Sequence, residues 1–182
     1  MMNEVIRVLK ERRSVREYLP KPIPKKVLED ILDCGRLAPS ANNRQPWLFV
    51  ASTEKQIRDE IAQLATYGKF IADAAACISV FCERDNNHLV EDGSAATQNI
   101  LIAAKAHGID SCWIAGYKKE HSETVRELLG VPQKYMLISL ISLGYSDKTV
   151  NKPKKPLNEV VRWEKYQCNI QVCGIRSEQI VE

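Results

Sequence analysis

The sequence lacks the features that mark exported, membrane-spanning and metal-binding proteins. Its longest mostly apolar runs, residues 74–82 and 136–143, are far shorter than the roughly 20 residues that a membrane helix needs. No long apolar stretch lies near residue 1, so we expect no secretory signal, no membrane partner and a cytoplasmic location. The six cysteines and three histidines show no Cys-x-x-Cys and no zinc-ligand spacing, which predicts reduced structural thiols and no metal.

Several common nucleotide-binding and nucleophile motifs are missing as well. The chain contains no Gly-x-Gly-x-x-Gly, no Gly-x-x-x-x-Gly-Lys-Ser/Thr and no Gly-x-Ser-x-Gly. These absences argue against a Rossmann dinucleotide turn, a P-loop and a hydrolase nucleophile elbow.

What the sequence has is the composition of an ordinary globular domain with two separate basic clusters. It has 182 residues, 45% hydrophobic and 27% charged, and a net charge of +3, which is too weak by itself to indicate nucleic-acid binding. Residues 4–16 carry five basic and two acidic side chains, and residues 148–155 carry four lysines and no acid. We expect an anion site if the fold brings these clusters together.

The apolar periodicity predicts a mixture of helices and strands without strict alternation, which indicates an α+β fold. A helix begins at Pro24, and an extended connector with three prolines precedes it. Residues 100–106 are apolar nearly all round, which places their helix in the middle of the fold or at a subunit interface. The full prediction is helices over residues 2–12, 24–38, 54–64, 92–107 and 122–129, and strands over residues 47–51, 74–82, 111–115 and 135–143.

Four segments are candidates for chemistry, and each also has a plain structural interpretation. Residues 12–16, Arg-Arg-Ser-Val-Arg, offer guanidinium and hydroxyl donors for a phosphate, or form a solvated helix end. The lysines of residues 152–155 fit an anion, or a solvated tail. The amide-rich loop of residues 39–46 suits a heteroaromatic ligand, although loops are commonly polar. Gly116, after a short strand, allows a ligand to approach the backbone closely, or simply forms a turn.

Taken together and in this order, these segments resemble the FMN-dependent nitroreductase family, as a short member. The resemblance covers about residues 4–162, with residues 12–16, 39–47, 111–117 and 152–157 as its motifs, and leaves residues 163–182 as a tail of unknown role. It implies a nitroreductase-like α+β domain with a central mixed or antiparallel sheet flanked by helices. It also implies a homodimer, with the long central helix at its interface and an FMN site on each side.

The resemblance assigns FMN contacts to individual residues. It places residues 12–16 and two lysines at the ribityl-phosphate end, residues 39–43 on the flavin from the partner subunit, and backbone N–H groups beside the flavin's reactive edge, where Ala115 stands in place of a frequent acidic residue. Lys69 is a further ring contact. The cofactor-binding residues are thus Arg12, Arg13, Ser14, Arg16, Pro39, Ser40, Ala41, Asn42, Asn43, Lys69, Ala115, Gly116, Lys152 and Lys154.

The activity implied is that of an oxidoreductase in which FMN takes hydride from NADH or NADPH and then reduces a small acceptor, such as a nitroaromatic or quinone, in a ping-pong cycle. No protein nucleophile or general acid is assigned. Flavin destruction, dehalogenation and azoline oxidation on the same scaffold stay open. A non-catalytic flavin-binding protein and a basic nucleic-acid binder are the rivals from other classes, the latter disfavoured by the small net charge.

Overall fold

The computed structural model describes residues 3–166, which divide into two compact units between Val150 and Asn151. The first unit contains every strand and all helices but one in the described part of the chain. In the second, an extended stretch leads into a short exposed helix, α6 (Leu157–Val160). No helix in residues 3–166 is long and apolar enough to cross a membrane.

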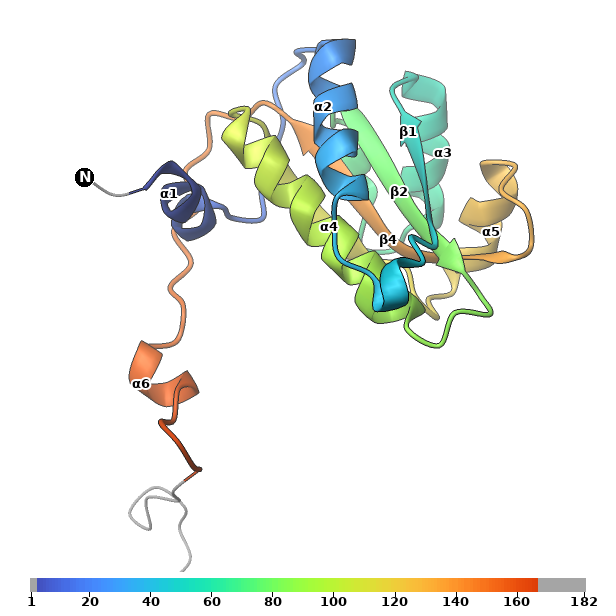
Figure 1. Ribbon diagram of the computed structural model, residues 1–182. Helices are drawn as coiled ribbons and strands as arrows, with labels where there is room; N and C mark the ends of the chain where they lie inside the picture. Colours follow the sequence, from blue (N-terminus) through green and yellow to red (C-terminus); the bar gives the residue numbers. More distant parts are fainter. Residues whose placement is uncertain (1–2, 167–182) are drawn as a thin grey trace, which may run out of the picture. The chain divides into compact units, whose positions relative to one another are not determined.

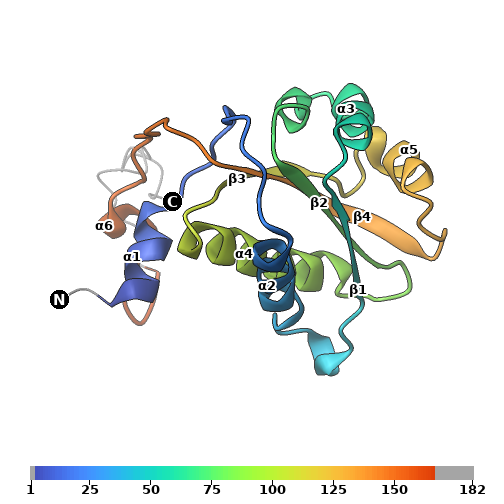
Figure 2. The same ribbon diagram turned by 90° about the horizontal axis from the view of Figure 1, so that it is seen from above.

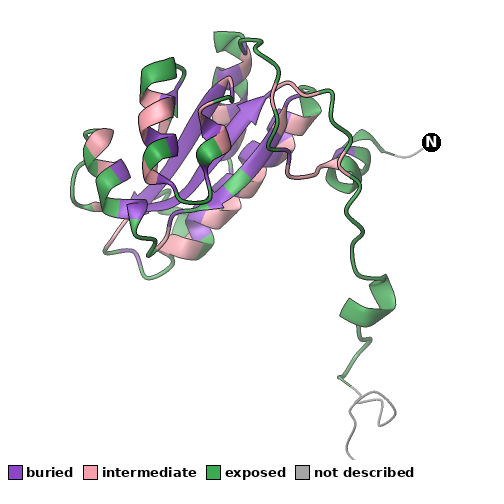
Figure 3. Ribbon diagram, turned by 180° about the vertical axis from the view of Figure 1, so that it is seen from behind, coloured by how far each residue is buried: buried purple, intermediate pink, exposed green. Residues whose placement is uncertain are grey.

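A four-stranded antiparallel sheet forms the centre of the first unit (Figure 1). Its strands are β1 (Trp47–Ser52), β2 (Ala76–Glu83), β3 (Asp110–Ala115) and β4 (Tyr135–Gly144), in the spatial order β1-β2-β4-β3. The two central strands are buried along nearly their whole length (Figure 3). Because both faces of β2 and β4 are covered, these strands are continuous apolar runs rather than alternating ones.

Helices cover both faces of this sheet (Figure 2). On one face lie α2 (Lys25–Arg36) and the long α4 (Leu89–Ala106). On the other lie α3 (Lys55–Leu64) and α5 (His121–Leu128), so the sheet separates two hydrophobic cores. The first helix, α1 (Glu4–Glu11), contacts α4. The structure is therefore the predicted α+β arrangement, with α4 packed between α2 and the sheet.

Close packing of α2 against α4 depends on a glycine. A Cβ at Gly35 would stand 2.7 Å from Cγ1 of the fully buried Ile100. The apolar second half of α4 is thus explained at least in part by burial within its own subunit.

The predicted elements are all present, with corrected ends. Pro24 is the N-cap of α2 rather than its first residue, because its ψ of 138° is extended. The helix predicted from residue 92 begins three residues earlier, at Leu89, so that Asp92 lies in its first turn. Three short elements were not predicted, the 3₁₀ helices η1 (Ala41–Asn43) and η2 (Lys69–Ile71) and the helix α6.

Candidate functional site

The outer edge of β3 is open over part of its length. The segment after α1 runs parallel to it at one point, where Ser14 pairs with Ser111 and the Val15 N–H donates to the Ser111 carbonyl at 3.0 Å. Backbone groups alternate between the two sides of a strand, so the N–H of Ala115, four residues on, also points away from β4. That end of the edge carries backbone donors that β4 does not use.

A cleft of about 940 Å³ lies along this open edge. Its walls come from β3, from η2 and the loop before it, from the start of α5 and from Arg16. Apolar and aromatic groups make up part of the lining, and basic groups another part. The lining residues are Arg16, Thr66, Tyr67, Lys69, Phe70, Cys112, Trp113, Ile114, Ala115, Lys118, Lys119, Glu120 and His121.

Of the four predicted phosphate-binding residues in the first basic cluster, three stand at alternate positions, Arg12, Ser14 and Arg16, in the segment that pairs with β3 beside the cleft. Burial raises the pKa of the Cys112 thiol, and Arg16, the Ser14 hydroxyl and Arg12 oppose that rise. Alternation in an extended chain puts positions 12, 14 and 16 on one side of the segment, and Arg16 is the one of the three that lines the cleft. Arg16 also stacks over the Phe70 ring, with its guanidinium carbon 5.7 Å from the ring centroid.

Arg13 lies on the opposite side of the same segment. Its Nη1 donates to the carbonyls of Lys10 and Arg12, at 2.7 and 2.8 Å, and the residue lines a different hollow with Lys105 and Asp110. The prediction treated residues 12, 13, 14 and 16 as one donor set. The structure brings three of them together and turns the fourth away.

The backbone N–H groups of Ala115 and Gly116 point to opposite sides of the strand. The Gly116 N–H donates to the Ile138 carbonyl of β4 at 2.9 Å, and its place beside a flavin stays a prediction. A Cβ at Gly116 would stand 2.6 Å from Cγ of Leu137, which explains the glycine by packing against β4 rather than by ligand approach. Ala115 is exposed in the cleft, and its N–H points to the open edge.

His121, a residue that the sequence did not single out, contacts the Ala115 carbonyl on the same open edge. Its Nε2 lies 3.1 Å from the Ala115 carbonyl oxygen, to which it donates when protonated at that nitrogen. Burial lowers the pKa of His121, against the opposing effect of that hydrogen bond. No periodicity or motif marks this histidine, because its contact depends on the tight turn that joins β3 to α5.

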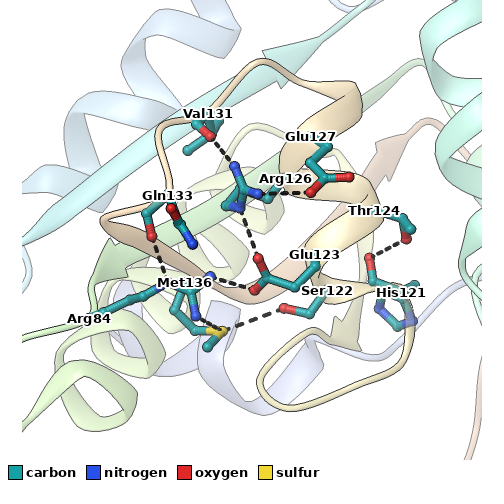
Figure 4. A network of polar contacts seen from close by, with 10 residues as sticks. All are labelled: Arg84, His121, Ser122, Glu123, Thr124, Arg126, Glu127, Val131, Gln133 and Met136. Atoms are coloured by element: carbon teal, nitrogen blue, oxygen red, sulfur yellow. Dashed lines mark hydrogen bonds and ion pairs between the residues drawn. The ribbon is translucent and has the colours of Figure 1, made fainter.

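A polar network fixes α5 beside the cleft (Figure 4). The Glu123 carboxylate accepts hydrogen bonds from Arg84 and from Arg126 Nε. Arg126 Nη1 also donates to the Val131 carbonyl at 2.7 Å. The helix that carries His121 is thus tied to the ends of β2 and β4.

The loop that was expected to contact the flavin lies elsewhere in the chain's own fold. Residues 41–43 form the 3₁₀ helix η1 (Ala41–Asn43), and the Ala41 N–H donates to Asp92 at 3.0 Å in the first turn of α4. The hollow of Arg13 includes Lys105, near the last turn of α4. Thirteen helical residues separate Asp92 from Lys105, which is roughly 20 Å at 1.5 Å per residue. None of the predicted loop residues, Pro39, Ser40, Ala41, Asn42 and Asn43, lines the cleft of their own subunit.

The remaining predicted residues fall into two groups. Lys69 lines the cleft, and its Nζ donates to the Gln63 carbonyl at 2.9 Å. Lys152 and Lys154 are exposed and belong to the second compact unit, so their part in a phosphate site stays a prediction.

Comparisons with known proteins identify relatives of this chain. The family described as the Nitroreductase family matches residues 9–76 and 64–145 of the chain. A protein of Archaeoglobus fulgidus named "Putative NADH dehydrogenase/NAD(P)H nitroreductase" is 37% identical over 150 residues, which is 79% of this chain and 86% of that protein. The NADPH-flavin oxidoreductase of Vibrio harveyi is 28% identical, over 91% of this chain and 76% of its own.

Solved structures show the same fold. An FMN-dependent nitroreductase from Clostridium difficile is 31% identical with a TM-score of 0.78, over 90% of this chain and 98% of that one. The NADPH:FMN oxidoreductase from Vibrio harveyi, solved with NAD+, has a TM-score of 0.79 at 26% identity, over 91% of this chain and 79% of its own.

Proposed function

Because this chain belongs to the nitroreductase family, we propose that it is an FMN-dependent oxidoreductase. It takes hydride from NADH or NADPH and passes the electrons to a small acceptor such as a nitroaromatic or a quinone. The observation that supports this most strongly is the cleft on the open edge of β3, which Arg16 lines and to which the outward backbone N–H of Ala115 points.

The residues present fit FMN. A cleft of about 940 Å³ falls within the range of roughly 300–1,000 Å³ usual for cofactor sites. Arg12, Ser14 and Arg16 supply charge-assisted donors of the kind that hold a phosphate or a polar ring edge. The Ala115 N–H is a fixed dipole on the cleft wall, and such dipoles stabilise negative charge without reorganising. Trp113 and Phe70 offer aromatic surface for a planar ring.

Bound FMN supplies the electron chemistry, accepting a hydride and releasing two electrons. The protein's own part is to bind, to orient and to exclude water. For a nitroaromatic acceptor the balance is one nitro compound, one NAD(P)H and one proton, which give the nitroso compound, NAD(P)+ and water. We assign no protein nucleophile and take the proton from solvent.

A second copy of the chain completes the site in this proposal. The loop of residues 39–43 is anchored at one end of α4, and the arginine segment lies near the other end (Figure 1). Two copies related by a twofold axis allow each loop to meet the partner's cleft, which gives two sites per homodimer. Apolar side chains on α1 support this pairing, because Val5, Ile6 and Leu9 are 59%, 43% and 44% exposed. The assignment of Lys152 and Lys154 to the phosphate remains part of this proposal.

Steady-state kinetics tests the proposal. We expect FMN-loaded protein to oxidise NADH or NADPH only when an acceptor is present, with the parallel double-reciprocal lines of a ping-pong cycle. Bound FMN without turnover by either nucleotide would favour a non-catalytic flavin-binding protein. Turnover that consumes FMN itself, or that requires a halogenated or azoline substrate, would favour another chemistry on the scaffold.

A further inference from the structure

The mouth of the cleft carries more positive charge than the proposed cofactor contacts use. Four basic residues line it, Arg16, Lys69, Lys118 and Lys119, against one acid, Glu120. None of the four basic side chains forms an ion pair within residues 3–166, whereas Lys55, Lys105 and Lys134 are each paired with a carboxylate. With Arg16 and Lys69 assigned to the cofactor, Lys118 and Lys119 have no assigned role.

A tight turn holds these two lysines at the cleft. The Lys119 N–H donates to the Gly116 carbonyl at 3.0 Å, and the Lys119 carbonyl accepts from the Ser122 N–H at 2.9 Å. Lys118 adopts a φ of +52°, in the left-handed region that few side chains occupy. Its Nζ stands 5.2 Å from the centroid of the Tyr117 ring, while Lys119 lies close enough to His121 to lower the pKa of that residue. The backbone of the turn therefore presents both charges at the mouth.

Aromatic surface lies within the same cleft. Trp113 is 37% exposed on β3, and Tyr67 is 86% exposed on the loop before η2. A planar ring gains from contact with such side chains, and a carboxylate on that ring gains from nearby ammonium groups. Neutral aromatic compounds use only the first of these two contributions.

We propose that Lys118 and Lys119 select acceptors that carry a negative charge, specifically planar aromatic carboxylates. This inference rests on the proposed function and adds the chemical class of its acceptor. The lysines act on the bound acceptor through their charge and take no part in electron transfer.

A matched pair of acceptors tests the proposal, 4-nitrobenzoate and the neutral 4-nitrobenzamide, with the FMN-loaded protein at saturating NADPH. The measured quantity is the ratio of kcat/KM for the benzoate to that for the benzamide. We expect Lys118→Asn/Lys119→Gln to lower this ratio about fivefold or more in low salt, since two unit charges near the carboxylate are removed. Asparagine is chosen at position 118 because it tolerates a positive φ.

A control with the same change in net charge is Lys26→Gln/Lys134→Gln. Both lysines are exposed outside the cleft lining, and Lys134, like Lys118, stands over a neighbouring tyrosine ring, at 4.9 Å. We expect this variant to keep the wild-type ratio. The unaltered protein gives an independent measurement, because its ratio is expected to fall several-fold as salt shortens the range of charge interactions to about 10 Å at 0.1 M.

A ratio that is the same in wild type and in Lys118→Asn/Lys119→Gln, and that does not change with salt, would overturn the inference and leave the proposed function standing. Failure of the wild type to reduce either compound, despite bleaching of its flavin by NADPH, would overturn it as well. Absence of any reaction with NADPH would instead reject the proposed function itself.

Discussion

The Asp92 carboxylate accepts a hydrogen bond from the Ala41 backbone N–H at 3.0 Å, although the two residues lie in different elements. Its other oxygen accepts from Nδ2 of the buried Asn86 at 2.8 Å. Asp92 is itself buried, in the first turn of α4, where the helix dipole favours a negative charge. One carboxylate therefore fixes the loop that we propose to reach the partner subunit's cleft.

Asp92→Asn should destabilise the protein. Each carboxylate oxygen of Asp92 accepts a hydrogen bond, and the NH2 group of asparagine would face one of these two donors without being able to accept from it. A buried donor left without its acceptor costs about 1–3 kcal/mol. Urea denaturation measures this loss, with the exposed Asp85→Asn as the matched control. Equal unfolding free energies for the two variants would show that the Asp92 contacts do not hold the loop.

Replacing Arg12 and Arg16 by alanine should remove FMN while leaving the fold intact. Each charge-assisted hydrogen bond contributes about 1.5–3 kcal/mol, so losing two should weaken FMN binding by roughly two to four orders of magnitude. Quenching of flavin fluorescence measures the affinity, and circular dichroism checks the fold. Unchanged FMN affinity in the double variant would refute the phosphate assignment.

Arg13→Ala is the matched control for that experiment. Arg13 carries the same charge as Arg12, but its guanidinium donates hydrogen bonds to the carbonyls of Lys10 and Arg12 on the other side of the segment. If the orientation of an arginine side chain determines its contribution to FMN binding, Arg13→Ala should lower FMN affinity far less than either Arg12→Ala or Arg16→Ala. An equal loss at all three positions would indicate a general charge effect instead.

Acid should destabilise the fold partly through His121. Burial lowers the pKa of this side chain in the folded state, so the unfolded chain binds a proton at higher pH than the folded one does. Its contribution to stability is complete above the ordinary pKa of about 6.5 and is lost as the pH falls below that value. The other charged residues that line the same cleft are Arg16, Lys69, Lys118, Lys119 and Glu120.

His121→Gln removes this titration but keeps an N–H able to reach the Ala115 carbonyl. We expect the unfolding free energy of wild type to fall more steeply than that of His121→Gln between pH 7.5 and pH 5. Parallel pH profiles, measured by urea denaturation, would contradict the burial of a neutral imidazole.

A buried hydroxyl pair joins α4 to the sheet behind Ala115. The Thr97 and Ser139 hydroxyl oxygens lie 2.7 Å apart, and Thr97 also donates to the Gly93 carbonyl. Thr97→Val should cost about 1–3 kcal/mol, because it leaves the Ser139 hydroxyl without its partner. Adding Ser139→Ala to that variant should cost little more, whereas strictly additive losses would show that the two hydroxyls do not interact.

The sequence was enough to predict the layers of the fold but not the directions in which the side chains of the site point. The buried runs that became β2 and β4 predicted central strands, since only strands covered on both faces are apolar throughout. The opposite orientations of Arg12 and Arg13 follow from the pairing of Ser14 with Ser111, which local sequence does not encode.

Gly116 and His121 show the same limit. Gly116 suggested close approach by a ligand, but Leu137, a residue of a later strand, is what leaves no room for a Cβ. His121 reaches Ala115 across a connecting turn in which Lys118 adopts a left-handed conformation. In both cases a contact made by folding decides the residue's role, and no motif records it.

The most direct test of the account is the visible spectrum of the purified protein incubated with FMN, before and after NADH or NADPH is added without oxygen. The account predicts the absorption bands of bound flavin, their loss on adding the nucleotide, and their return when a nitroaromatic or quinone acceptor follows. No binding of FMN would contradict the account, because it would leave the cleft beside Arg12, Ser14 and Arg16 without the cofactor to which they are assigned.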